Sequence, residues 1–320
     1  MKKLRVMVMF LLVSVLSLAA PIKVGLILAQ GGLGDKSFND SAYAGLMKAK
    51  KELNADVKYV EPDSWMEDAT YLKEFAENEY DLIIATSYTA QDAMEQLAPK
   101  YPKTKFAIVD TNAKEGENIA SLVFNEVEGS FLVGALAAKM SKTGKIGFVG
   151  ALDIPLINRF RSGYEQGAKY VNPDIKVVAS YVGGDAPFSD PIKGKEHAFS
   201  QANQGIDVIY HAAGNTGVGV LDGVKEKGIY GIGVDSDQDE IVKGKILTSM
   251  LKNIDTAIYK IIEDTMNGKF EGKIHEFGLK ENGVGTTEYK YTKDIIGKEN
   301  IEFVEKIKKD IINGKIEVIK

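Results

Sequence analysis

Short, continuous apolar segments alternate with amphipathic ones along the chain from residue 22. Residues 22–29 (IKVGLILA) are almost entirely apolar or β-branched, as expected for a strand buried on both faces of a parallel sheet. Residues 39–53 then carry apolar side chains at helical spacing. Further strands are predicted at 57–60, 82–85 and 106–109, and helices at 67–76 and 90–97. This βαβ order predicts a doubly wound sheet with right-handed crossovers.

A second series of the same kind follows a helix predicted at residues 129–140. Its strands are predicted at 145–150 (KIGFVG), 175–182, 208–212 and 231–234, and its helices at 157–170, 197–203 and 218–227. Later segments predict a strand at 246–250, a helix at 255–266, a strand or loop at 289–292 and a helix at 301–312. Direct sequence repetition between the two series is weak, so the pattern indicates similar architecture only.

The chain length agrees with two units. At about 150 residues per domain, 320 residues suggest two domains, each able to bury a core. We predict an α/β fold of two doubly wound lobes: residues 21–124 plus 246–275 form the N-terminal lobe, and residues 125–245 plus 276–320 the C-terminal lobe. Because no segment rich in Pro, Gly or Ser divides the chain, we expect short hinge strands between the lobes.

The first 19 residues have the organisation of a secretory signal peptide. Three positive charges precede a thirteen-residue apolar run at 6–18, which is too short for a transmembrane helix of about 20 residues. Ser17 and Ala19 are small residues that suit signal peptidase. We therefore expect cleavage of residues 1–19 and export; an uncleaved anchor is the alternative. Removing three positive charges changes the formal net charge from −5 to −8.

Composition excludes several classes of site. The chain has no cysteine, which rules out disulfides, thiol nucleophiles and cysteine-ligated metals. Its three histidines lack the spacing of a metal site, and we expect no cofactor. The negative net charge argues against a nucleic-acid partner, because such binding depends on Lys and Arg at phosphates.

Polar, glycine and phenyl residues follow the predicted strands directly. In open α/β sheets, ligands bind outside the carboxyl ends of the strands, so two such sheets that face each other predict a cleft between lobes. Carboxylates there can accept from hydroxyl and ring N–H groups, and phenyl faces can stack on a flat ring. The strand-end candidates are Asp35, Phe38, Asn39, Asp110, Phe188, Gly214 and Asp235.

Each candidate also has a purely structural interpretation. Asp35, Asn39 and Asp110 could be turn residues or helix caps, and Phe38 and Phe188 could belong to the core. Gly214 could simply allow a strand to turn into a helix. The hypothesis of a common site depends on the joint placement of these residues at strand ends.

Two segments resemble nucleotide-binding motifs, but neither matches its motif completely. Residues 31–37 (GGLGDKS) resemble a P-loop, but Asp35 stands directly before Lys36, where the motif needs glycine. Gly217 and Gly219 open a predicted helix, but Asp222 stands at the third glycine of a dinucleotide fingerprint. Neither segment predicts a phosphate site.

The strand-end motifs resemble those of the basic membrane protein family, the substrate-binding proteins of ABC importers whose characterised members bind purine nucleosides. The similarity covers essentially the whole chain after the signal segment, in order. The motifs are Asp35-Lys-Ser-Phe38-Asn39, residues 106–110 (FAIVD), 124–138 (FNEVEGSFLVGALAA), 188–196 (FSDPIKGKE), 212–219 (AAGNTGVG), 233–238 (GVDSDQ) and 247–255 (LTSMLKNID).

The resemblance implies a type I periplasmic-binding fold, with three crossing strands and a ligand between two lobes. It further implies that Phe38 and Phe188 stack on the base and that Asp110 accepts from ring N–H groups, assisted by Asn39 and Asp35. Asp235 and Lys252 would hold the ribose hydroxyls, with Asp237 as the alternative to Asp235. Gly214 would offer backbone groups where a side chain would clash.

The expected partners are a purine nucleoside and the membrane subunits of an ABC permease, with the protein itself a monomer. Many family members carry a lipid-anchor cysteine directly after the signal peptide, and this sequence has Ala20 and Pro21 there. We therefore expect a free periplasmic protein. Two other functions stay open: a nucleoside hydrolase or glycosidase that uses paired carboxylates, and a ligand-sensing or adhesin domain.

Overall fold

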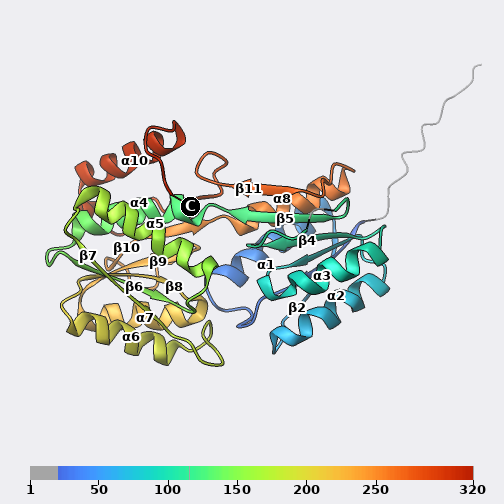
Figure 1. Ribbon diagram of the computed structural model, residues 1–320, viewed down its shortest axis with the longest axis horizontal. Helices are drawn as coiled ribbons and strands as arrows, with labels where there is room; N and C mark the ends of the chain where they lie inside the picture. The colour runs from blue at the N-terminus through green and yellow to red at the C-terminus, as the bar shows by residue number, and fades with distance from the viewer. Residues whose placement is uncertain (1–20, 115, 320) are drawn as a thin grey trace, which may run out of the picture.

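Two α/β lobes lie side by side in the computed structural model, which describes residues 21–114 and 116–319 (Figure 1). The predicted signal segment at residues 1–19 lies outside the described residues. The strands of the first sheet are β1 (Lys23–Ile27), β2 (Asp56–Val60), β3 (Leu82–Ala85), β4 (Lys105–Val109), β5 (Ile119–Phe124) and β11 (Ile274–Phe277). Those of the second are β6 (Lys145–Gly150), β7 (Lys176–Tyr181), β8 (Val208–Ala212), β9 (Tyr230–Asp235), β10 (Ile246–Lys252) and β12 (Val284–Thr286).

Helices cover both faces of each sheet. Around the first sheet they are α1 (Phe38–Leu53), α2 (Asp68–Glu77), α3 (Gln91–Leu97) and α8 (Ile254–Met266), with 3-10 turns η1 (Trp65–Glu67), η2 (Tyr88–Ala90) and η3 (Ala98–Lys100). Around the second they are α4 (Glu126–Met140), α5 (Pro155–Val171), α6 (Pro191–Asn203), α7 (Gly214–Lys227), α9 (Lys293–Ile296) and α10 (Lys298–Ile312).

The two sheets have the same strand order. The first runs β11-β5-β4-β3-β1-β2 and the second β12-β10-β9-β8-β6-β7. Every pairing is parallel except that of β10 with β12. The predicted α/β architecture of two doubly wound lobes is therefore confirmed.

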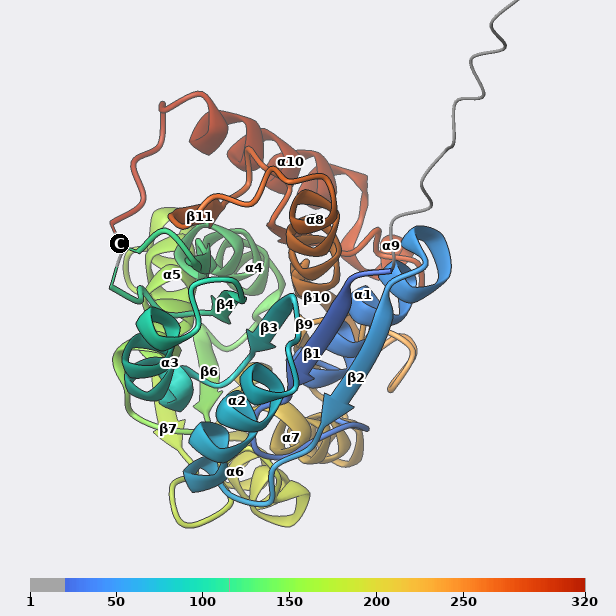
Figure 2. The same cartoon turned by 90° about the vertical axis from the view of Figure 1, so that its right-hand side faces the viewer.

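Strands buried on both faces explain the continuous apolar runs. In β1, Leu26 packs on the side of α1, while Ile27 packs with Phe75 of α2 on the opposite side. Figure 2 shows α2 and α3 apart from α1 and α8, with the sheet between them. The fully buried side chains of β3 on both faces follow from this sandwich.

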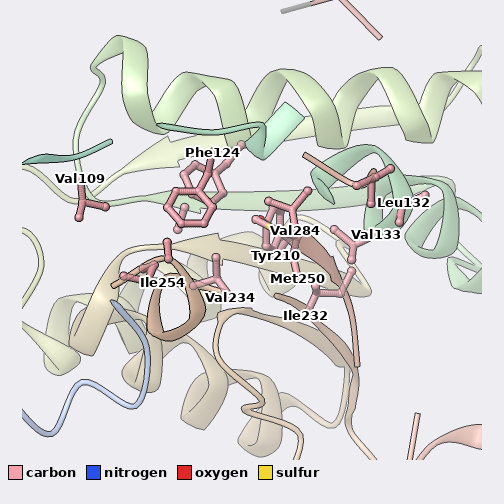
Figure 3. Packing of buried hydrophobic residues seen from close by; sticks show 14 of the residues in the cluster. Val109, Phe124, Leu132, Val133, Tyr210, Ile232, Val234, Met250, Ile254 and Val284 are labelled. Carbon is pink, nitrogen blue, oxygen red and sulfur yellow. The ribbon is translucent and has the colours of Figure 1, made fainter. Parts of the chain in front are cut away.

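The main core runs from one lobe into the other. Val109 and Phe124 of the first lobe belong to the same buried cluster as Val234 and Met250 of the second. Figure 3 shows Phe124 close to Ile254 and Val234 where the lobes join. Burial of this apolar surface stabilises the junction between the lobes, close to the carboxyl ends of the strands.

The structure corrects one predicted lobe boundary. Strand β10 pairs with β9 and β12 in the second sheet, so the assignment of residues 246–252 to the N-terminal lobe is wrong. The chain returns to the first lobe only at Asn253, after which α8 packs against α1. The other lobe boundaries stay predictions.

Candidate functional site

A cavity of about 660 Å³ lies between the lobes, at the carboxyl ends of both sheets. From the first lobe it is lined by residues that follow β1, β3 and β4, and from the second by residues at the ends of β8, β9 and β10. All eight predicted site residues line it: Asp35, Phe38, Asn39, Asp110, Phe188, Gly214, Asp235 and Lys252. Their roles in binding stay predictions. Asp237 is not among its lining residues and borders a separate surface cavity.

Asp35 caps the first helix. Its carboxylate accepts hydrogen bonds from the backbone N–H groups of Ser37 (2.9 Å), Asn39 (2.8 Å) and Asp40 (3.2 Å). The structural interpretation of this residue as a cap is thus observed. Burial raises the pKa of Asp35, and these backbone hydrogen bonds oppose that shift. The carboxylate fixes the loop that presents Phe38 to the cavity.

Asn39 lies on the first turn of α1 and is buried. Its Oδ1 accepts from the backbone N–H of Ala29 at 3.0 Å. Within the described chain, no hydrogen bond is made by its Nδ2 group. The side chain therefore joins the loop after β1 to α1 and keeps two N–H donors for another partner.

The two phenylalanines come from different lobes. Phe38 begins α1, and Phe188 lies in the loop before α6; both are half-buried and pack against the main core. Phe188 is held by the start of α7, because the backbone N–H of Thr216 donates to its carbonyl at 3.2 Å. Gly214 has φ +53°, and a Cβ there would lie 3.1 Å from the same carbonyl. Glycine is therefore favoured at this contact.

Lys252 is the centre of a buried ionic network. Its side chain is 1 % exposed, and its Nζ lies 2.5 Å from the Asp110 carboxylate and 3.1 Å from Glu126 Oε1. Arg159 Nε donates to Glu126 Oε2 at 2.8 Å. Burial would lower the pKa of Lys252, but Asp110, Glu126 and Asp235 together raise it. Two cations thus face two carboxylates in a low-dielectric region.

Phenyl rings surround the same ammonium group. Lys252 Nζ lies 5.2 Å from the ring centroid of Phe38, 5.1 Å from that of Phe124 and 5.4 Å from that of Phe160. These distances are within the range of cation–π attraction. The three rings therefore stabilise the ammonium charge of Lys252 at the boundary between core and cavity.

Asp235, at the end of β9 in the second lobe, takes part in hydrogen bonds that link the two lobes. Ser37 Oγ of the first lobe donates to Asp235 Oδ2 at 2.5 Å, and Ser236 Oγ donates back to the Ser37 carbonyl at 3.1 Å. Burial raises the pKa of Asp235 to about 7, while Lys252 and Ser37 oppose the shift. A proton can therefore be held at this carboxyl near neutral pH.

The candidates taken from the sequence do not include every residue of this region. Glu126 and Arg159 complete the network, and Trp65 of η1 lines the cavity while 56 % exposed. Glu126 stands two residues after the end of β5, a strand that the pattern analysis did not identify. A search of every strand end would have found it.

The described residues include neither a metal-binding cluster nor a membrane-spanning helix. Across residues 21–114 and 116–319, no three His, Asp or Glu side chains form a group that could hold a metal ion. Within the same ranges, every helix is too short or too polar to cross a bilayer.

The chain matches a known family over residues 22–320, the one described as ABC transporter substrate-binding protein, PnrA-like. The chain belongs to this family. It is 36% identical over 320 residues to the CD4+ T-cell-stimulating antigen of Listeria innocua, covering 92% of this chain and 87% of that one. It is 35% identical over 319 residues to the ABC transporter nucleoside-binding protein BmpA of Lactococcus lactis, covering 93% and 89%.

Other similarities agree with the family and the fold. Basic membrane protein A of Borreliella burgdorferi is 38% identical over 272 residues, which cover 82% of this chain and 78% of that one. The crystal structure of an ABC transporter solute-binding protein from Aeropyrum pernix has a TM-score of 0.87 at 33% identity, with 93% of each chain covered. The resemblance to basic membrane proteins and the predicted periplasmic-binding architecture are confirmed.

Proposed function

We propose that this PnrA-like protein binds a purine nucleoside in the interlobe cavity and delivers it, chemically unchanged, to the permease of an ABC importer. The observation that carries the proposal is that one cavity is lined from both lobes by Phe38 and Phe188 and by the carboxylates of Asp110 and Asp235. Its volume of about 660 Å³ is within the usual range of small-molecule sites. The name of the Lactococcus lactis relative supports the same ligand class.

The side chains divide between a flat base and a sugar. Phe38 and Phe188 stack on the base, and Asp110 accepts from its ring N–H groups, with Asn39 Nδ2 as a donor beside it. Asp235 and Lys252 bind the ribose hydroxyls. Asp35 acts by fixing the loop, because its carboxylate is already used by three backbone N–H groups. Gly214 offers backbone groups next to Phe188.

The location and state of the protein follow from the same role. A substrate-binding protein for an importer works outside the cytoplasmic membrane, so we propose cleavage of residues 1–19 and a free, monomeric periplasmic protein. Phosphates are disfavoured by the carboxylates around the cavity, so we propose nucleosides rather than nucleotides as ligands.

The native ligand is the direct test. Protein purified without added ligand is denatured, and the released small molecules are identified by mass spectrometry. Calorimetric titration of ligand-free protein with inosine, guanosine and adenosine then measures affinity, and chromatography of the mixtures measures product. Saturable binding with unchanged nucleoside is expected. Turnover of the nucleoside, or binding of none of the three, contradicts the proposal.

A further inference from the structure

Ser37 is a buried residue of the first lobe that does not line the interlobe cavity, although Asp35, Phe38 and Asn39 beside it do. It is 0% exposed. Its backbone N–H donates to Asp35 Oδ1 at 2.9 Å, within the first lobe. Its carbonyl and its hydroxyl contact the second lobe. Ser37 can therefore act on a ligand only through the residues that it contacts.

The hydroxyl of Ser37 reaches the last two residues of β9. Its Oγ donates to Asp235 Oδ2 at 2.5 Å, and the Val234 carbonyl oxygen lies 3.4 Å from the same Oγ. A serine hydroxyl has one hydrogen to donate, and the much shorter contact with the carboxyl takes it. Hydrogen bonds to an ionised acceptor are also about twice as strong as those between neutral groups. The protein itself therefore occupies Asp235 Oδ2.

The second oxygen of the same carboxyl has no protein partner. Among residues 21–114 and 116–319, none donates a hydrogen bond to Asp235 Oδ1 or forms an ion pair with it. This oxygen is also absent from the enclosed side-chain atoms without a partner, to which Asp110 Oδ1 belongs. Asp235 Oδ1 therefore keeps accessible surface, and Asp235 lines the interlobe cavity. It is the Asp235 oxygen that a ligand can reach.

Two further hydrogen bonds join the same segments of the two lobes. Ser236 Oγ donates to the Ser37 carbonyl at 3.1 Å, and Gln238 Nε2 donates to the Lys36 carbonyl at 3.1 Å. Gln238 is 1% exposed, so its hydrogen bond is shielded from water. These two bonds hold the lobes together without touching the Asp235 carboxyl. The Ser37 hydroxyl alone links this interlobe contact to that carboxyl.

We propose that Ser37 is a positioning residue, which engages Asp235 Oδ2 when the lobes meet and so turns Oδ1 toward the cavity to accept a hydrogen bond from a ribose ring hydroxyl of the ligand. The proposal rests on the proposed function, because the ligand must carry that hydroxyl. Because Ser37 and Asp235 belong to different lobes, this acceptor is completed only when the lobes are together. Recognition of the sugar is thereby coupled to closure of the cavity.

Protonation of Asp235 gives the proposal a measurable signature. Burial raises the pKa of Asp235 to about 7; Lys252 and the Ser37 hydroxyl oppose the shift, while Asp110 and Asp35 add to it. The other titratable groups near Asp235 are Tyr210 of β8 and the residues that border the surface cavity with it: Lys36, Asp40, Asp237, Glu240 and Asp255. All of these remain in a Ser37 variant. An ionised carboxylate accepts from a hydroxyl more strongly than a protonated one, so affinity for a riboside should rise with pH through about 7.

The experiment measures calorimetric affinities for guanosine and adenosine, and for their 2′,3′-dideoxy forms, from about pH 5.5 to about pH 8.5 in the full mature chain. Expected for the wild-type protein is a preference for the riboside that increases through about pH 7. Ser37→Ala removes a donor that favours the ionised carboxyl, so the midpoint of this increase should rise by about one pH unit or more. Ser37→Cys keeps a similar shape but a weak donor, so its midpoint should lie between the other two.

Ser236→Ala is the matched control. It removes the neighbouring hydrogen bond between the lobes, the one from Ser236 Oγ to the Ser37 carbonyl, and leaves the Asp235 carboxyl with its donor. Its affinity for every ligand should fall alike, and the midpoint should stay at the wild-type value. A residue that served closure alone would behave in the same way.

The outcomes separate the two proposals. Nucleoside binding with the same pH midpoint in the wild-type protein and Ser37→Ala overturns the role of Ser37 alone, as does a wild-type riboside preference that is constant with pH. Equal upward shifts in Ser37→Ala and Ser236→Ala also overturn it. If Ser37→Ala does not fold, the midpoint in Ser37→Cys decides the matter. Absence of nucleoside binding by the wild-type protein overturns both proposals.

Discussion

Asp110 and Asp235 occupy equivalent places in the two sheets. Asp110 directly follows β4 and Asp235 ends β9, each the third strand from the outer edge of its sheet. Both residues have left-handed backbones, with φ values of 69° and 63°. Such values are uncommon outside glycine, and Asp tolerates them better than most residues. Two carboxylates thus enter one cavity from opposite lobes by the same backbone turn.

The stability of ligand-free protein should depend on the protonation of Asp235. Its pKa in the folded protein is about 7, whereas an exposed aspartate titrates near 3.9. Between these values the folded protein holds a proton that the unfolded chain has lost. The free energy of unfolding therefore falls as pH rises from about 4 to 7, by at most about 1.4 kcal/mol per pH unit from this group.

Asp235→Asn isolates that contribution. Asparagine also tolerates a positive φ and can accept from Ser37 Oγ, but it does not titrate. Between pH 5 and pH 8, the free energy of unfolding measured in urea should fall by at least about 2 kcal/mol more for the wild-type protein than for the variant. Lys252, Asp110 and Asp35, the charged groups acting on Asp235, are present in both proteins. Equal losses in the two proteins would contradict the raised pKa.

Removing either phenyl ring should weaken nucleoside binding without changing which sugar is preferred. Stacking of a base on an aromatic side chain contributes about 1–3 kcal/mol in nucleic-acid binders, so Phe38→Ala or Phe188→Ala should weaken binding by roughly 5- to 150-fold. Calorimetry with ribosides and 2′-deoxyribosides provides the test. Phe199→Ala is the control, because this half-buried ring of α6 contacts Lys195 and Lys227 and does not line the cavity. Unchanged affinity in both Phe38→Ala and Phe188→Ala would contradict the stacking role of these rings.

Trp65 should report ligand binding by fluorescence. It is the single tryptophan of the chain, it lines the cavity, and it is 56 % exposed. A ligand beside the indole changes its contact with water, so the emission spectrum should shift during a titration. Trp65→Phe should abolish the shift while calorimetry still detects binding. An emission shift that persists in the Trp65→Phe variant would contradict this assignment.

The sequence predicted the strands well where burial on both faces makes them continuously apolar. Strands β3, β6 and β8 begin and end where the pattern placed them. By contrast β5 was missed, because the polar Ser121 interrupts its apolar run. Because β5 was missed, Glu126 just beyond it was not considered as a candidate.

Helix starts were predicted late where glycine or proline serves packing. Helix α6 begins at Pro191 rather than His197, and α7 at Gly214 rather than Val218. A Cβ at Gly219 would lie only 1.8 Å from the Pro191 carbonyl, so close contact between α6 and α7 requires glycine there. Tertiary packing overrides the low helix propensity of these residues, and propensity alone cannot reveal it.

The candidate site was predictable as a set of residues but not as a network. The strand-end residues could be named because parallel strands place their ends at one sheet edge. The pairing of Lys252 with Glu126 depends on three-dimensional contact between β10 and the start of α4, which are far apart in sequence. The sequence pattern contains no signal for that contact.

Helices α4 and α5, which carry Glu126 and Arg159, touch through glycines, and this contact should be intolerant of a methyl group. A Cβ at Gly167 would lie 1.9 Å from the Phe131 carbonyl. Alanine gains about 1 kcal/mol of helix propensity over glycine, but overpacking typically costs about 1–3 kcal/mol, and backbone at this distance must move. Gly167→Ala should therefore lower the calorimetric melting temperature. The control is Gly285→Ala, since a Cβ there meets no atom within 4 Å. A Gly167→Ala variant that melts at the wild-type temperature would contradict this packing requirement.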